Sequence, residues 1–142
     1  MTSKKAVELL KEIVKYSQKS TGFEQVLKNI QVTGGDVGHC LAEFVVKKEN
    51  LNAGGGLHGG FTATVVDNFT TYALVTTNSS PGVTVDLHVS YLKGAREGDT
   101  IIVDAKAVKT GKTLAYLECE LRNKNTGQII AKGSQTKFVA SP

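Results

Sequence analysis

The chain has 142 residues, 40% of them hydrophobic and 21% charged, which is typical of one globular domain with a core of its own, here spanning residues 1–142. With only two prolines and no tryptophan, the composition excludes a collagen-like or disordered chain. The net charge of +4 is mild, and no basic stripe alternates with aromatic residues, so we expect no nucleic-acid partner.

The N-terminal residues predict an amphipathic helix over about residues 3–19, with Ser3 as its N-cap. One face of this helix is apolar and carries Val7, Leu10, Ile13 and Val14. The segment is basic, as mitochondrial presequences are, but it contains two glutamates and no arginine. We therefore expect a cytoplasmic location, with a mitochondrial one as the alternative. No signal peptide is evident, and no stretch approaches the roughly 18 apolar residues of a membrane span, so we expect no membrane insertion.

Most of the remaining chain has the pattern of β-strands. Residues 26–50 alternate on both sides of a glycine-rich turn, which predicts a β-hairpin. From Val83 onward the pattern is again strand-like, with turn signals at 93–99, 109–113 and 123–127. These segments predict a run of antiparallel strands with short loops.

Residues 61–77 are ambiguous, because threonine and valine favour strands. A run of this length without a turn signal is nevertheless too long for a typical strand, and length favours a helix. Asp67 is its only formal charge, so such a helix needs burial on most of its surface. The predicted fold class is therefore α+β, with an antiparallel sheet wrapped around one long central helix.

The stretch "NAGGGLHGG", residues 52–60, directly precedes this helix. A helix beginning near Gly59 and Gly60 exposes unpaired N–H groups with a partial positive charge, and glycine leaves that backbone open to a ligand. Such a site suits an oxygen that gains negative charge, as in acyl transfer. A glycine pair at a helix start is also typical of a simple turn.

Asp67 is the second unusual feature. A lone carboxylate in a buried helix is costly unless it is paired, shifted in pKa or functional; the structural alternative is a carboxylate that accepts hydrogen bonds from threonines or backbone groups. Asp67 follows Gly59 by eight residues, which is about 12 Å along one helix. If both act on one reacting carbon, they must come from two chains, which predicts an active site shared across a homodimer.

Three segments together resemble one family: "NAGGGLHGGFTATVVDN", "PGVTVDLHVSYL" and "KTGKTLAY". They resemble the hotdog-fold acyl-CoA thioesterases, in the subgroup of the phenylacetate-pathway thioesterases and the animal thioesterase superfamily member 2, over nearly the whole chain. The resemblance implies a hotdog fold with an extra N-terminal helix, and hydrolysis of medium- to long-chain fatty acyl-CoA to free acid and CoA. It also implies a homotetramer, and no cofactor or metal beyond the CoA of the substrate.

The resemblance also implies catalytic roles. The Gly59 N–H would polarise the thioester carbonyl, and Asp67 of the partner subunit would be the general base or the nucleophile. Asn52 and His58 would help to position the water and the carbonyl. Thr84, where relatives often have serine, would hydrogen-bond the attacking water. The plain alternatives are a turn former at Asn52, a turn histidine at His58 and an ordinary strand residue at Thr84.

The CoA moiety needs positive charge and backbone donors. The basic excess from Lys93 onward suits a phosphorylated small molecule, although a solvated face gives the same pattern. In "KTGKT" two lysines flank a glycine whose N–H could meet a phosphate, with a plain hairpin turn as the alternative. The resemblance implies CoA contacts at Tyr91, Lys93, Arg96, Lys109, Gly111, Lys112 and Thr113.

Several further residues have weaker signals. Phe61, Val65 and Phe69 are candidates for an acyl-chain tunnel, with a core role as the alternative for each. Cys40 and Cys119 are too few for a disulfide framework or a zinc site, and we expect small buried residues in a reducing compartment.

Two other functions are compatible with this pattern. A hotdog hydratase or dehydratase acts on acyl thioesters with a carboxylate and a histidine, but His58 ahead of the helix and Asp67 in its middle match the hydrolase pattern better. The third possibility is a non-catalytic acyl-CoA-binding protein.

Overall fold

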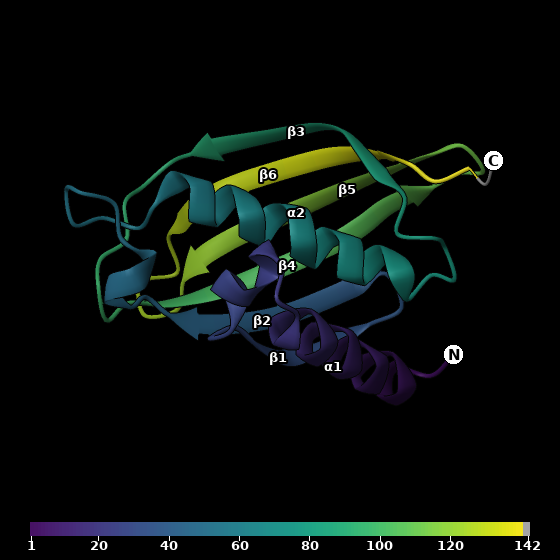
Figure 1. Cartoon of the computed structure of the whole chain (residues 1–142), viewed down its shortest axis with the longest axis horizontal. Helices are drawn as coiled ribbons and strands as arrows, with labels where there is room; N and C mark the ends of the chain where they lie inside the picture. The colour runs from purple at the N-terminus through teal and green to yellow at the C-terminus, as the bar shows by residue number, and fades with distance from the viewer. Residues whose placement is uncertain (141–142) are drawn as a thin grey trace.

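The computed structural model describes residues 1–140, which form a six-stranded antiparallel sheet. Figure 1 shows a long helix, α2 (Gly59–Val75), lying across one face of this sheet. The strand order is β1-β2-β4-β5-β6-β3. The strands are β1 (Gln31–Asp36), β2 (His39–Val45), β3 (Val83–Tyr91), β4 (Thr100–Thr110), β5 (Leu114–Asn123) and β6 (Ile129–Phe138). A second helix, α1 (Ser3–Lys19), and two short 3-10 helices, η1 (Phe23–Leu27) and η2 (Lys48–Asn50), complete the fold. This is the predicted α+β architecture, that of a hotdog fold.

Helix α1 packs on β1 through Ala6, Leu10 and Val14, which confirms the predicted amphipathic helix. Its N-cap is Thr2, however, and the prediction of Ser3 was wrong. Thr2 has extended backbone angles and its hydroxyl accepts a hydrogen bond from the Lys5 N–H at 3.2 Å, whereas Ser3 is already helical.

The predicted hairpin is present as β1 and β2, but its first part was wrong, because residues 23–27 form η1. Leu27 and Ile30 are both buried at 1% exposure, and the Gln18 side-chain amide donates to their carbonyls at 2.8 and 2.7 Å. Burial and these hydrogen bonds hold the segment against α1, away from the sheet.

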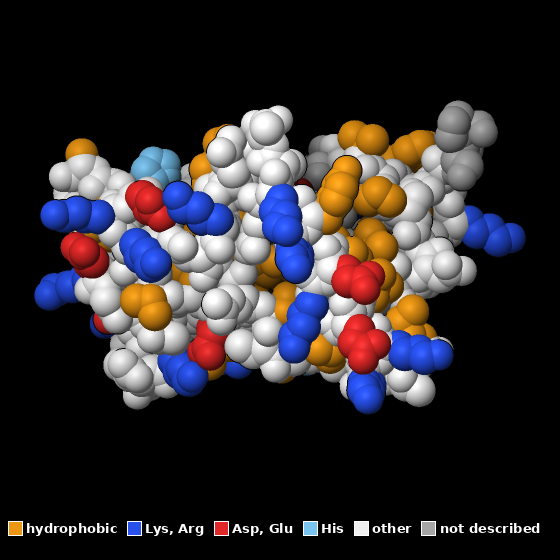
Figure 2. Space-filling model, turned by 60° about the horizontal axis from the view of Figure 1, so that its bottom comes forward, with side chains coloured by type: hydrophobic (Ala, Val, Ile, Leu, Met, Phe, Trp, Pro, Cys, Tyr) orange, Lys and Arg blue, Asp and Glu red, His pale blue; other side chains and the backbone are white. Residues whose placement is uncertain are grey.

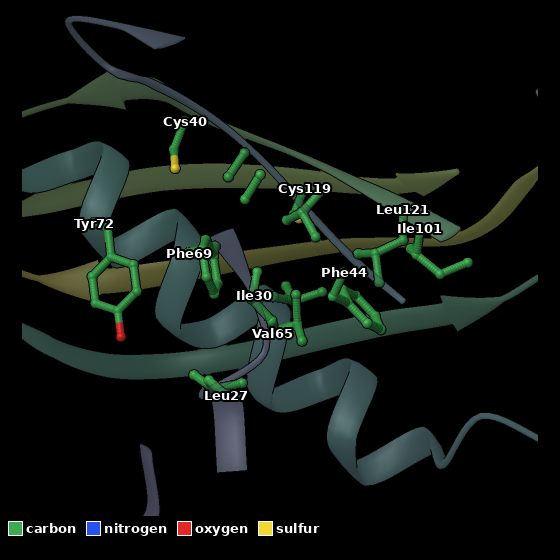
Figure 3. Close-up of a cluster of buried hydrophobic side chains, with 14 of the residues drawn as sticks. Leu27, Ile30, Cys40, Phe44, Val65, Phe69, Tyr72, Ile101, Cys119 and Leu121 are labelled. Carbon is green, nitrogen blue, oxygen red and sulfur yellow. The ribbon is translucent and has the colours of Figure 1, made fainter. Parts of the chain in front are cut away.

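Helix α2 confirms the central helix that its length predicted, and it ends at Val75, just before Asn78 turns the chain with a φ of 68°. Its buried face packs against the sheet, and at β6 the approach is close enough that a Cβ added to Gly133 would lie 2.6 Å from Val66. Figure 3 shows the resulting core, in which Val65, Phe69 and Tyr72 of α2 meet side chains from β2, β4 and β5.

Both cysteines are free and buried in this core, as the sequence predicts. Burial, with a smaller contribution from the negative charge of Asp104, raises the pKa of the Cys40 thiol to about 12. Burial also raises the pKa of the Cys119 thiol. Both thiols are therefore small apolar core groups rather than nucleophiles.

Within residues 1–140, the outer strand β3 pairs with β6 alone, so its other edge is unpaired in this part of the chain. Seven of its nine residues are exposed, including Val83, Val85 and Leu87. An exposed apolar strand edge is a ready surface for pairing with another strand.

The surface carries charges of both signs. Figure 2 shows lysines, arginines and acidic side chains intermixed on one face, with hydrophobic patches between them. Among residues 1–140, no helix is long and apolar enough to cross a membrane.

Candidate active site

Among the residues that the structure describes, a single N–H group at the start of α2 has no acceptor. The Nδ1 atom of the N-cap residue, His58, accepts hydrogen bonds from the N–H groups of Gly60 at 2.8 Å and Phe61 at 3.3 Å. The His58 carbonyl accepts the Thr62 N–H at 3.1 Å. The Gly59 N–H donates to no residue that the structure describes. It is therefore the donor that the first turn offers to a ligand, at the positive end of the helix dipole.

Two close approaches explain the glycines at this point. A Cβ added to Gly60 would lie 2.8 Å from the His58 ring, so a side chain there would displace the cap. At Gly59 an added Cβ would lie 3.3 Å from the ring of Tyr91, whose hydroxyl donates to the Gly59 carbonyl at 2.6 Å. Tyr91, at the end of β3, thus holds the residue that carries the free N–H, through the carbonyl of that residue.

Asn52 organises the glycine loop that precedes the helix. Its Oδ1 accepts the N–H groups of Gly54 at 2.9 Å and Gly56 at 3.1 Å, while its own N–H donates to the Gly56 carbonyl at 2.8 Å. The side-chain oxygen is thus engaged within the loop, and the side-chain amide nitrogen donates to no described residue.

The glycine loop forms one wall of a cavity of about 740 Å³, whose opposite wall is residues 93–97. Lys93 and Arg96 line this cavity, and a β-bridge between Gly56 and Arg96 joins the two walls. The structure therefore brings both predicted basic residues next to the start of α2.

Asp67 lies on the side of α2 that faces β3 and β6. The Thr84 hydroxyl is 3.5 Å from Asp67 Oδ1 and 2.9 Å from Gln135 Oε1. The Gln135 amide nitrogen donates to the Asp67 carbonyl at 2.8 Å and to Thr70 Oγ1 at 2.6 Å. The predicted pair of Asp67 and Thr84 is thus held together by a glutamine that the sequence did not single out.

Lys137 also belongs to this cluster, since its ammonium donates to Thr71 Oγ1 at 2.8 Å and its register partner on β3 is Thr84. Only 5% of Lys137 is exposed. Burial lowers the pKa of its amine, and the negative charge of Asp67 acts in the opposite direction. Gln135 and Lys137 escaped prediction, although polar residues at the inward positions of a strand are a signal that could have revealed them.

The turn at 109–113 lies at the Asp67 end of the sheet. The Thr113 carbonyl accepts the Val139 N–H at 2.8 Å. The next residue, Leu114, pairs with Phe138 of β6, and Phe138 also pairs with Val83 at the start of β3. The Gly111 N–H donates to the Leu114 carbonyl at 2.9 Å, so this N–H closes the hairpin turn.

The predicted site residues thus fall into two groups within one chain. The first, called the glycine half-site below, comprises Asn52, His58, Gly59, Tyr91, Lys93 and Arg96. The second, called the carboxylate half-site, comprises Asp67, Thr84, Lys109, Gly111, Lys112 and Thr113. Because Gly59 and Asp67 lie in one continuous helix, their backbones are about 12 Å apart along its axis, too far for the Asp67 side chain to serve a group bound at Gly59 of the same chain.

The three candidates for an acyl tunnel differ in exposure. Val65 and Phe69 are fully buried in the core, which favours the core alternative for both. Phe61 is partly exposed and lines a separate pocket beside η1.

Comparison with known proteins gives consistent matches. Residues 54–130 match the family model of the thioesterase superfamily. Human acyl-coenzyme A thioesterase 13 is 42% identical over 133 residues, which cover 93% of this chain and 95% of the human protein. The crystal structure of zebra fish thioesterase superfamily member 2 is 36% identical, with a TM-score of 0.92 over 94% of this chain and 98% of the fish protein. A Streptococcus mutans protein whose structure was solved bound to acetyl CoA is 28% identical, with a TM-score of 0.76 over 87% of this chain and 94% of that one. The fold, the family match and the near full-length relatives lead to one conclusion: the chain belongs to the thioesterase superfamily.

Proposed function

We propose that the protein is an acyl-CoA thioesterase that hydrolyses fatty acyl-CoA of medium to long chain length to a free acid and CoA. The observation that carries the proposal is the free Gly59 N–H at the start of α2, in a chain whose one carboxylate on that helix is Asp67. The name of the human relative, and the acetyl CoA bound to the Streptococcus mutans protein, support the same substrate class.

In the proposed reaction the thioester carbonyl oxygen accepts a hydrogen bond from the Gly59 N–H, which stabilises the negative charge that develops on that oxygen. Asp67 from the partner subunit removes a proton from water, and the resulting hydroxide attacks the carbonyl carbon. The carbon–sulfur bond then breaks, the CoA thiolate takes up a proton, and the acid is released. In the alternative route the Asp67 carboxylate attacks directly, and water hydrolyses the resulting anhydride.

The unpaired edge of β3 supports a homodimer that joins the two half-sites. Tyr91 at one end of β3 contacts Gly59, and Thr84 at the other end contacts Asp67. Antiparallel pairing of two β3 strands about a two-fold axis sets the Tyr91 end of one chain beside the Thr84 end of the other. Each glycine half-site then faces a carboxylate half-site of the partner. By family resemblance, the proposal extends to a homotetramer of two such dimers.

The same arrangement gives CoA two basic surfaces. Lys93 and Arg96 lie beside the glycine loop, and Lys109 and Lys112 lie at the carboxylate end. In the proposed dimer the two basic surfaces come from different chains, so both chains would contribute to binding the phosphates of CoA. The proposed reaction needs no metal or further cofactor, and we place it in the cytoplasm, with the mitochondrion as the alternative.

The geometry of His58 disfavours the hydratase alternative. Because Nδ1 accepts two backbone N–H groups, the neutral ring carries its proton on Nε2 and has no free lone pair to act as a base. A carboxylate–histidine pair that shuttles a proton therefore lacks its histidine here.

The proposal is tested by supplying purified protein with acyl-CoAs from acetyl to palmitoyl and following the release of free thiol. We expect turnover with wild type and a fall in kcat of about 10²–10⁴-fold in Asp67→Asn, the range for loss of a general base. The variant should still bind CoA, because the amide keeps the shape of the carboxylate. Absence of turnover with every chain length would refute the proposal, and equal turnover by the variant would remove Asp67 from the mechanism.

A further inference from the structure

A pocket of about 430 Å³ opens beside the start of α2, on the side that faces η1. Its apolar lining consists of Phe23, Val26, Leu51 and Phe61. Phe23 is 69% exposed and Val26 is 37% exposed, although both are large apolar residues on a short helix. Exposed apolar side chains around a concave surface are typical of a site for an apolar ligand.

The walls of this pocket are held in place by the core. Leu27 of η1 is buried, and Gln18 donates to its carbonyl at 2.8 Å, which ties η1 to α1. On the opposite wall, the Phe61 ring packs edge-on against Phe44 with centroids 5.5 Å apart. The exposed faces of Phe23 and Val26 therefore project from a fixed support.

The pocket is continuous with the glycine half-site. His58 and Gly60, which flank the free Gly59 N–H, are part of its lining. Leu51 lines both this pocket and the cavity that contains Lys93 and Arg96. A carbonyl bound at Gly59 thus has an apolar pocket on one side and a basic cavity on the other, which matches the polarity of an acyl-CoA thioester.

We propose that this pocket binds the acyl chain of the substrate, and that Phe23 and Val26 set the chain length it accepts. The inference rests on the proposed thioesterase function and adds the place of the acyl chain to it. Its volume is nearly three times that of a 150 Å³ cavity that holds one benzene, so it accommodates a fatty chain rather than only an acetyl group.

A second apolar cavity of about 300 Å³ competes for the same role. It lies between the α2 start and residues 91–95, and Leu57, Tyr91, Leu92 and Ile130 contribute to its lining. Both linings carry charge, but Lys28 and Glu49 of the pocket beside η1 form an ion pair at 3.8 Å, whereas Lys93 of the second cavity has no carboxylate partner among residues 1–140. The second cavity therefore suits the polar arm of CoA better than an alkyl chain. Substitutions that fill each cavity in turn show which of the two binds the acyl chain.

The test uses Val26→Trp, which fills the pocket beside η1, and Leu92→Trp, which fills the competing cavity. Val37→Trp is the matched control, since Val37 is 42% exposed in the turn between β1 and β2. We expect Val26→Trp to lower kcat/KM for palmitoyl-CoA by about tenfold or more and to leave acetyl-CoA nearly unchanged, as steric exclusion from an apolar pocket should. Val37→Trp should leave the whole profile unchanged.

Three outcomes would overturn the inference: an equal effect of Val26→Trp on all chain lengths, no effect at all, or a selective loss in Leu92→Trp instead. A change of oligomeric state in Val26→Trp, seen by size-exclusion chromatography, would assign the surface to a contact between copies and would also overturn it. If wild type hydrolyses no acyl-CoA, calorimetric titration with palmitoyl-CoA tests separately whether the pocket binds an acyl chain. Weaker binding by Val26→Trp than by Val37→Trp would then support the pocket while the proposed function fails, and equal binding would refute both.

Discussion

At the scale of single residues, the proposed chemistry depends on one backbone N–H, which makes Gly59→Pro an informative change. Proline removes this donor and is tolerated at the first position of a helix. His58, with φ −66° and ψ 128°, already has the extended conformation required before proline. We expect kcat to fall about 10²–10³-fold, as on loss of one oxyanion donor, measured as thiol release.

Gly59→Ala is the matched control, because it adds the same Cβ, 3.3 Å from the Tyr91 ring, but keeps the N–H. It should retain most of the activity of wild type. Equal losses in both variants would assign the effect to the displaced tyrosine and would contradict a role for the N–H.

The sequence singles out Asp67 and Gly59 as candidate site residues, because a lone charge and a glycine cluster stand out in an otherwise apolar segment. It did not identify Gln135 and Lys137, which lie in a strand of ordinary mixed composition. Their role depends on which face of β6 meets α2. A shift of one residue in the strand register would turn both side chains to the opposite face of the sheet. Strand register is set by long-range pairing, which a local pattern does not contain.

At the scale of elements, the close packing of α2 against β6 at Gly133 gives a stability prediction. A Cβ at Gly133 would lie 2.6 Å from a methyl group of Val66, deep in the core. Gly133→Ala should therefore lower the free energy of unfolding by about 1–3 kcal/mol, the range for overpacking. Gly94→Ala is the control, because its Cβ meets nothing within 4 Å, and its effect should stay within about 0.5 kcal/mol.

Urea titration of both variants measures this difference as a shift in the midpoint at constant slope. Equal midpoints for the two variants would show that β6 moves away from α2 at little cost. The packing argument would then fail, although the assignment of the catalytic residues would be unaffected.

Elements with strong local signals were predicted well, and elements decided by tertiary contacts were not. The length of the apolar run revealed α2, and glycine-rich breaks revealed the turns around β4, β5 and β6. The predicted hairpin includes the end of η1, because Val26 and Leu27 fit the pattern of a strand as well as that of a helix. The burial of Leu27 and its hydrogen bond from Gln18, nine residues earlier in the chain, decide its conformation.

At the scale of the whole molecule, the proposed reaction requires a second chain, because it draws on both half-sites. Each chain carries a donor at one end of α2 and a carboxylate in its middle, and the helix holds them about 12 Å apart. In the proposed dimer, the outer edge of β3 is the surface on which a second copy supplies the missing half-site.

Subunit complementation tests this arrangement directly. Gly59→Pro disables the glycine half-site and Asp67→Asn the carboxylate half-site, so each homodimer should be nearly inactive. When differently tagged copies are co-expressed in equal amounts, half of the dimers are mixed, and in each mixed dimer one site carries both defects while the other carries neither. We expect about a quarter of wild-type activity in the total pool and about half in mixed dimers purified through both tags. If both residues act within one chain, no site in a mixed dimer is intact, and thiol release would stay at the level of the single variants.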